Sequence, residues 1–230
     1  MTNKIHRYTS EAIDVTFDPK RCIHAAECVR GLPAVFDRNK RPWAQPGNAG
    51  ADDVSMVVVR CPTGALHFER NDGGEAEPIA GENTITLVKD GPLFVRGNVE
   101  IWTASGETVS VETRLALCRC GASANKPFCD NSHLRIEFQD AGGLSANRVV
   151  AGEQESLTVT PLRNGPLLLR GSFELLSADR HTNYQGTKAE LCRCGGSRNK
   201  PFCDGTHRRI GFTDADEGVA ANAQPLELPN

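Results

Sequence analysis

The sequence predicts an α+β fold in which a small mixed N-terminal domain precedes a duplicated β-rich module. The first observation is a motif of the form C-x-C-x8-C-x3-H, which starts at Cys118 and again at Cys192, 74 positions later. The second is a strand–turn–strand pattern that recurs ahead of each motif at the same offset. The third is that three of the nine cysteines stand apart, within the first 61 residues. A chain of 230 residues has room for about one to three domains.

Residues 11–70 form the predicted N-terminal domain. Apolar and polar residues alternate over 13–17, which is the pattern of a strand with one buried face. Residues 51–60 are predicted to form a short helix, because the acidic side chains near its start suit the positive end of the helix dipole. A returning strand is expected at 65–69. The Gly-, Glu- and Pro-rich residues 71–82 are expected to be a linker.

The duplicated module is expected to consist of two repeats, residues 83–140 and 156–214. Each begins with a β-hairpin signal, in which two runs of apolar and β-branched residues flank a turn that contains Gly-Pro. In the first repeat this hairpin covers 84–97. A Gly- and Ala-rich connector, 141–155, joins the repeats, and residues 215–230 are predicted to be a frayed tail.

Each motif contains the donor atoms of one metal centre, three thiols and one imidazole within 16 residues. The first two cysteines are two apart, so an extended backbone would point both sulfurs to one side. The third cysteine and the histidine are four apart, and a helix beginning at the third cysteine would place them on one face. The N-terminus of such a helix would favour a negatively charged iron–sulfur cluster. The candidate ligands are Cys118, Cys120, Cys129 and His133 in the first repeat, and Cys192, Cys194, Cys203 and His207 in the second.

Two other interpretations of these motifs remain. Three cysteines and one histidine are a known structural zinc set, although the usual zinc motif has two residues between its first cysteines. Disulfide bonds are a weaker explanation, because nine is an odd number of cysteines and the histidines would have no role. An iron–sulfur centre is the interpretation that the spacing favours.

The second motif contains Cys-Asp-Gly-Thr-His at 203–207 and resembles the CDGSH, or NEET, family of iron–sulfur proteins. The first has Cys-Asp-Asn-Ser-His at 129–133, with Asn131 at the family's glycine. Asparagine tolerates the left-handed conformation better than most residues, so we expect the loop to be preserved.

This resemblance implies one [2Fe–2S] cluster in each motif. The first two cysteines of a motif would hold one iron, and the third cysteine and the histidine would hold the other. The family fold is a small β-rich dimer with two clusters near its two-fold axis. A single chain with two motifs is therefore expected to form an intrachain pseudo-dimer.

The N-terminal cysteines, Cys22, Cys28 and Cys61, resemble the pattern of a single-cluster bacterial ferredoxin. In that pattern, C-x2-C-x2-C is followed at a distance by a cysteine that precedes proline, as Cys61 does here. The middle position is Ala25, which cannot bind iron. We therefore expect a divergent ferredoxin-like domain with three thiolate ligands.

Three thiolates match a [3Fe–4S] cluster, which lacks the iron that a fourth ligand would hold. A [4Fe–4S] cluster is the alternative if His24, Glu27 or water supplies that ligand. A further alternative is that the three cysteines are buried structural residues without a cluster.

Four basic residues flank the ligands of the two motifs. They are expected to be solvated surface charges, or else to offset cluster charge and contact an acidic partner. These residues are Arg119, Lys126, Arg193 and Lys200.

Composition excludes several classes of protein. The net charge of −3 gives no electrostatic case for binding nucleic acid or an anionic membrane. No apolar run approaches the length of a membrane span, and the first residues lack the apolar segment of a signal peptide. We expect a soluble protein of a reducing compartment, the cytoplasm.

The sequence shows no recognisable combination of a nucleophile and a general base, so we do not expect an enzyme. The expected function is that of a one-electron carrier with a redox partner protein, working as a monomer with an internal pseudo-two-fold axis. The alternative is iron–sulfur cluster storage, transfer to an apo acceptor, or redox and pH sensing, for which a labile histidine ligand would be suited. A third possibility is a zinc-stabilised interaction module.

Overall fold

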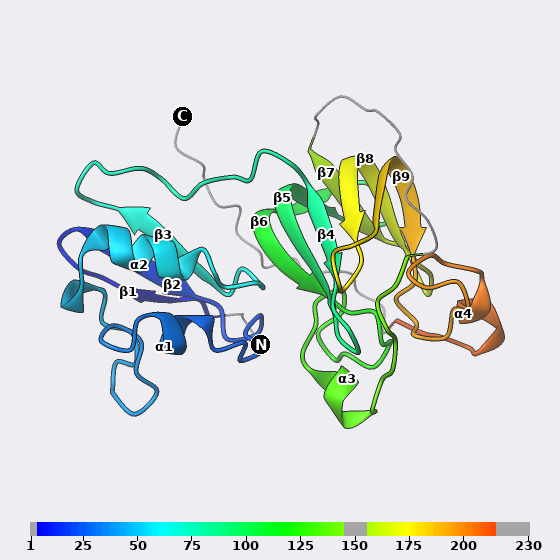
Figure 1. Cartoon of the computed structure of the whole chain (residues 1–230), viewed down its shortest axis with the longest axis horizontal. Helices are drawn as coiled ribbons and strands as arrows, with labels where there is room; N and C mark the ends of the chain where they lie inside the picture. Colours follow the sequence, from blue (N-terminus) through cyan, green and yellow to red (C-terminus); the bar gives the residue numbers. More distant parts are fainter. Residues whose placement is uncertain (1–3, 145–155, 215–230) are drawn as a thin grey trace. The chain divides into compact units, whose positions relative to one another are not determined.

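The computed structural model describes residues 4–144 and 156–214. The chain divides into two compact units, Met1–Ile79 and Ala80–Asn230, which are described separately (Figure 1). The predicted tail and most of the predicted connector, residues 145–155, lie outside the described residues. No helix in the described part of the chain is long and apolar enough to cross a membrane.

The first unit is a three-stranded antiparallel sheet with two helices. The sheet has the order β1-β2-β3. Its elements are β1 (His6–Tyr8), β2 (Ile13–Phe17), α1 (Glu27–Gly31), the 3-10 turn η1 (Pro46–Asn48), α2 (Ala51–Val58) and β3 (Leu66–Arg70). The two predicted strands and the predicted helix are confirmed, although α2 ends two residues early. The edge strand β1 lies before residue 11, where no strand was predicted.

The core of the first unit forms where α2 packs on the sheet. Ile13 and Val15 of β2 are buried on one face, as the alternating pattern requires. Val54 and Val58 lie four apart on α2 and are fully buried against them. The helix therefore holds the segment before Cys61 against the sheet.

The second unit contains both repeats. The first repeat has β4 (Thr84–Leu87), β5 (Leu93–Trp102), β6 (Thr108–Leu117) and the short helix α3 (Ser132–Arg135). The second has β7 (Leu157–Pro161), β8 (Leu167–Leu176), β9 (Asn183–Leu191) and α4 (Thr206–Arg209). Both predicted hairpins are confirmed, and their second strands continue beyond the predicted ends.

The six strands form one sheet in which the repeats exchange strand partners. Strand β4 is antiparallel to β5 of its own repeat and parallel to β8 of the other. Strand β7 is likewise antiparallel to β8 and parallel to β5. Thr84 lies opposite Glu174, and Thr158 opposite Glu100, which is the same pair after a shift of 74. Neither repeat therefore forms its part of the sheet alone.

Glycines at the middle of β5 and β8 allow each long strand to change partner. The register shifts there, between Arg96 and Val99 and at the equivalent place in β8. A Cβ atom on Gly171 would lie 2.2 Å from the Ser156 carbonyl oxygen, and its φ is +99°. Only glycine fits this position, because both the space and the backbone conformation exclude a side chain.

One hydrophobic core serves both repeats. Inward-facing residues of β5 and β8, such as Val95 and Leu169, are fully buried and belong to the same hydrophobic cluster. Phe128 and Phe202, from the two loops that carry the motifs, pack against this cluster. The sheet therefore anchors each ligand loop through an aromatic side chain next to the third cysteine.

Candidate metal centres

The first two cysteines of each motif follow the last strand of their repeat. Cys118 comes directly after β6, and its Sγ lies 3.7 Å from that of Cys120. Cys192 and Cys194 have the same separation, 3.7 Å. A tetrahedral metal with Sγ atoms at about 2.3 Å holds two such ligands about 3.8 Å apart. Each pair therefore has the spacing of two ligands on one metal.

The third cysteine of each motif is paired with the histidine. Cys129 Sγ lies 3.4 Å from His133 Nδ1, and Cys203 Sγ lies 3.3 Å from His207 Nδ1. A sulfur and a nitrogen on one tetrahedral metal are about 3.6 Å apart. Nδ1 is thus the ring nitrogen that faces the thiol in both repeats.

The predicted helix start at Cys129 is wrong. Helix α3 begins at Ser132, and the residue before it, Asn131, has φ 69°. A left-handed residue cannot continue a right-handed helix, so Cys129 lies in the preceding loop. The expectation that Asn131 adopts the left-handed conformation is confirmed, and Gly205 adopts it at the equivalent place with φ 81°.

Backbone amides stabilise the third cysteine of each motif. The Asn131 amide donates to Cys129 Sγ over 3.4 Å, and the Gly205 amide donates to Cys203 Sγ over 3.5 Å. The left-handed turn aims these amides at the sulfur. A thiolate that accepts an amide hydrogen bond is favoured over the thiol.

The aspartate after the third cysteine ties the loop to the helix. Asp204 accepts hydrogen bonds from the amides of Arg198, over 2.9 Å, and Thr206, over 3.0 Å. The Arg198 bond, followed by those from Thr206, holds the pKa of Asp204 well below its ordinary value. Asp130 makes the equivalent bonds in the first repeat. This residue shapes the loop and is not one of the paired donors.

The arginines between the first two cysteines are buried, so the expectation of solvated charges is wrong for them. Arg119 and Arg193 are each 2% exposed. Arg193 donates to the carbonyls of Gly165, over 2.8 Å, and Leu162, over 2.6 Å, and pairs with the Asp214 carboxylate. Arg119 binds equivalent groups in the first repeat. Each arginine therefore fastens a ligand loop to the hairpin turn of its own repeat.

The flanking lysines are also bound to the loops. Lys126 Nζ donates to the Ser123 carbonyl over 2.6 Å, and Lys200 Nζ donates to the Ser197 carbonyl over 2.7 Å. Lys126 also lies 5.9 Å from the ring centre of Phe212, in the other repeat. These lysines are partly buried and help to order the loops.

The two ligand loops meet at Cys120 and Cys194, which form an antiparallel bridge. A Cβ atom on Gly121 would lie 2.6 Å from the Cys194 carbonyl oxygen, and one on Gly195 would lie 2.6 Å from that of Cys120. Both glycines have positive φ. The glycines therefore permit the backbone contact that places the two candidate centres next to each other.

The donors are arranged as pairs, not as quartets around one ion. Within residues 4–144 and 156–214, no three His, Cys, Asp or Glu side chains are close enough together to hold a single metal ion. A structural zinc site needs four donors around one ion. A two-iron cluster takes two protein ligands on each iron, and the observed pairs fit that chemistry better.

Most of the thiols are held in their protonated form when no metal is bound. Burial raises the pKa of Cys129 to about 11 and that of Cys194 to about 11. In the Cys118–Cys120 pair, the hydrogen bond between the sulfurs lowers the pKa of Cys118 to about 6 and raises that of Cys120. Metal binding must therefore release protons from these sites.

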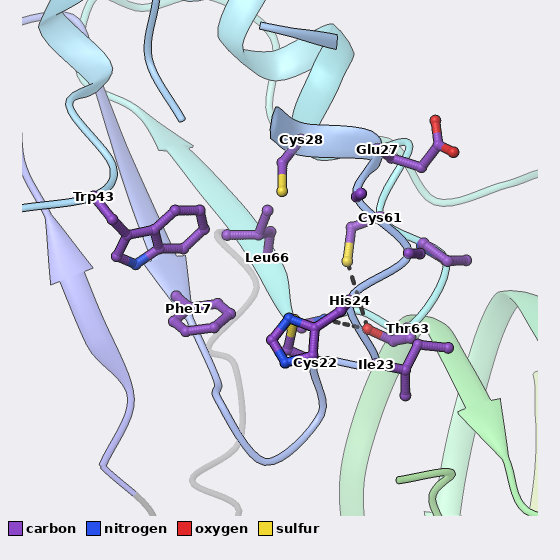
Figure 2. A pocket seen from close by; sticks show the side chains of 14 residues that line it. Phe17, Cys22, Ile23, His24, Glu27, Cys28, Trp43, Cys61, Thr63 and Leu66 are labelled. Atoms are coloured by element: carbon purple, nitrogen blue, oxygen red, sulfur yellow. Dashed lines mark hydrogen bonds between the residues drawn. The ribbon is translucent and has the colours of Figure 1, made fainter. Parts of the chain in front are cut away.

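The three N-terminal cysteines come together around one pocket. Cys22 lies in the loop after β2, Cys28 lies in α1, and Cys61 follows α2. They line a cavity of about 30 Å³ with apolar neighbours that include Phe17 and Leu66 (Figure 2). Burial raises the pKa of Cys28 to about 11, with smaller contributions from the nearby Cys61 and Cys22.

Sequence reasoning missed one residue at this pocket. Thr63 is buried, and its hydroxyl lies 3.5 Å from Cys61 Sγ and accepts the Ala65 amide over 3.2 Å. The threonine stands two residues after Cys61, directly after the proline that marked this cysteine as a candidate ligand. A polar residue at that position was therefore a signal that could have been used.

Comparisons with known families agree with these centres. The family described as "Iron-binding zinc finger CDGSH type" matches residues 90–134 and 164–208. The family described as "Divergent 4Fe-4S mono-cluster" matches residues 8–71.

Individual proteins add little about function. The uncharacterized protein YjdI of Escherichia coli strain K12 is 39% identical over 61 residues, which cover 26% of this chain and 80% of that protein. The protein of the same name in Escherichia coli O157:H7 gives the same values. No solved structure matches the chain significantly. From the geometry and the family matches together, the chain combines one domain of the divergent 4Fe-4S mono-cluster family with two iron-binding domains of the CDGSH family.

Proposed function

We propose that this protein is a one-electron carrier with three iron–sulfur clusters. The observation that carries the proposal is the arrangement of each CDGSH motif as two donor pairs, 3.7 Å and 3.3–3.4 Å apart. Each motif would hold a [2Fe–2S] cluster through its three cysteines and its histidine. When bound, clusters of this kind accept and release single electrons. Both matched families are typically carriers or binders, which supports a carrier in preference to an enzyme.

We also propose that the two repeats form an intrachain pseudo-dimer, so that a second copy of the chain is not needed to complete the module. Three features support it: the reciprocal pairing of β4 with β8 and of β7 with β5, the shared core, and the bridge between Cys120 and Cys194. In this arrangement each ligand loop supports the other.

The N-terminal pocket is proposed to hold a third cluster through Cys22, Cys28 and Cys61. The fit rests on three thiols facing one apolar cavity, in a domain matched by a four-iron family. Three thiols alone would hold a [3Fe–4S] cluster, and a fourth donor would allow a [4Fe–4S] cluster. The apolar walls and the partial burial of the three cysteines limit the contact of the thiols with water.

The test is a measurement of iron, acid-labile sulfide and zinc per chain on protein purified without oxygen. We expect about four irons and four sulfides from the two repeats, and about three or four further irons from the N-terminal domain. Cys203→Ser should remove the iron and sulfide of the second repeat, and Cys28→Ser should remove those of the N-terminal domain. Colourless protein with two or three zinc ions would refute the proposal.

The alternative function is cluster storage, transfer or sensing. It is favoured by the single histidine in each donor set, because acid that protonates the imidazole removes it from the metal. Reversible reduction and oxidation without loss of iron would support the carrier. Rapid transfer of iron and sulfide to an apo [2Fe–2S] ferredoxin would support the alternative.

The proposed partner is therefore a redox protein, or an apo cluster acceptor under the alternative. We propose the cytoplasm as the location. The support is that all nine cysteines are free, as expected in a reducing compartment.

A further inference from the structure

We propose that the imidazole of His24 supplies the fourth ligand of the N-terminal cluster, which is then a four-iron cluster held by Cys22, Cys28, Cys61 and His24. This inference rests on the proposed function, since it presupposes a cluster in the N-terminal pocket. It replaces the [3Fe–4S] cluster that three thiols by themselves predict.

The pocket offers few donors besides the three thiols. The side chains along its wall that could bind iron are His24, Glu27 and Thr63. The Thr63 hydroxyl is already engaged by the Ala65 amide and Cys61. The Glu27 carboxylate lies 3.4 Å from the Arg30 guanidinium, and Figure 2 shows it pointing away from the sulfurs. His24 is the donor that remains.

The position of the His24 ring suits this role. Its Nδ1 lies 3.9 Å from Cys22 Sγ, and Figure 2 shows the ring beside Cys22 at the wall of the pocket. The ring also lines an adjoining hollow of about 120 Å³, together with Cys22, Cys28 and Trp43. Among the described residues, Nε2 of this ring has no hydrogen-bond partner, so one nitrogen is available to a metal.

The backbone of the cysteine loop is bent, and the bend explains how His24 can act as the ligand that the ferredoxin pattern has at position 25. His24 has φ 56° and Ala26 has φ 65°, and neither is glycine. Non-glycine residues with positive φ are uncommon, and strained ones cluster at active sites and ligand-binding loops, where the surrounding structure holds them. Arg30 fixes the bend by donating to the Ala25 carbonyl over 2.6 Å.

The consequence is a displacement of the donor by one position. In the ferredoxin pattern the middle ligand would stand at position 25, where this chain has alanine. With two left-handed residues in the loop, the neighbouring imidazole lies at the wall of the pocket, beside Cys22. All three centres would then share one donor set, three cysteines and one histidine, and the neutral imidazole leaves each cluster less negative than four thiolates would.

The experiment compares iron content and EPR spectra of the full chain and its variants, purified without oxygen. Relative to Cys28→Ser, the parent should contain about four more irons. His24→Ala should lose one iron per chain and show the oxidised signal of a [3Fe–4S] cluster, whereas His24→Cys should retain all four. Glu27→Ala and His67→Ala are the controls, and both should match the parent. Circular dichroism checks that each variant is folded.

Other outcomes separate the two proposals. If His24→Ala keeps the iron and spectrum of the parent, or if the parent already holds three N-terminal irons, His24 is not a ligand. Loss of an iron in Glu27→Ala with none lost in His24→Ala would assign the ligand to Glu27 and overturn the inference. If Cys28→Ser has as much iron as the parent, there is no N-terminal cluster, and the proposed function itself fails for this domain.

Discussion

Replacing Arg193 with methionine tests whether the buried arginines hold the ligand loops in place. Methionine keeps much of the apolar stem but removes every donor. The change leaves the Asp214 carboxylate without its cation and removes the guanidinium donors to the carbonyls of Gly165 and Leu162. The Leu162 carbonyl still accepts the Gly165 amide. It also removes the guanidinium that lies 5.5 Å from the Phe212 ring centre.

The cost can be worked out from the burial of the pair. Removing one partner of a buried ion pair costs about 3–5 kcal/mol. The Asp214 side chain is 23% exposed, so water can partly solvate the remaining carboxylate and the lower end applies. For a unit of this size, about 3 kcal/mol lowers Tm by roughly 6–12 °C. Arg119→Met should cost more, because Asp140 is only 14% exposed.

Thermal unfolding followed by circular dichroism measures this effect, and Arg170→Met is the matched control. Arg170 is exposed on β8, and such surface changes usually alter stability by no more than about 0.5 kcal/mol. Iron analysis after mild heating adds a local readout. Arg193→Met should lose iron from the second repeat before the first, and Arg119→Met should lose iron from the first repeat before the second. Equal Tm values for Arg193→Met and Arg170→Met would refute the argument.

Three further predictions concern the second repeat. In His207→Cys, the visible absorbance of that centre should survive to a lower pH than in the parent, because acid competes with the metal for an imidazole ligand; equal bleaching of the two proteins would contradict a histidine ligand. Gly195→Ala should destabilise more than Gly106→Ala, since both have positive φ but only the first Cβ meets backbone, 2.6 Å from the Cys120 oxygen; urea midpoints that fall equally would argue against the loop contact. The lowered pKa of Asp204 means that its stabilisation is full above about pH 4 and is lost as pH falls through the lower folded-state pKa. Asp204→Asn should therefore be less stable than the parent at pH 7 and lose less on acidification, and parallel pH profiles would count against this role.

The sequence by itself determined which residues could bind metal and how the chain is divided. The donor sets, the duplication and the hairpins depend on spacing within a few residues, and such patterns are visible without a fold. The left-handed Asn131 was predictable for the same reason, because it follows from the backbone preference of one residue.

Other features were decided only by tertiary structure. The helix was predicted at Cys129 from a four-residue spacing, yet the left-handed residue that precedes Ser132 delays it. Arg193 was expected in solvent, but its partners lie 21 to 31 positions away along the chain, so nothing local showed that it would be buried. Similarly, the three residues of β1 show no alternation typical of a strand, and they form a strand because their backbone pairs with the edge of β2.

The pairing of strands between the two repeats is the clearest example of a feature that depends on the tertiary structure. Thr84 and Glu174 pair across 90 positions, and no periodicity links them. The pairing arises because β5 and β8 are longer than their own hairpin partners and leave unpaired backbone, which the other repeat satisfies. Sequence therefore specified the candidate ligands of each motif, whereas the shared sheet specified that the two candidate centres lie side by side, since only long-range backbone pairing brings Cys120 to Cys194.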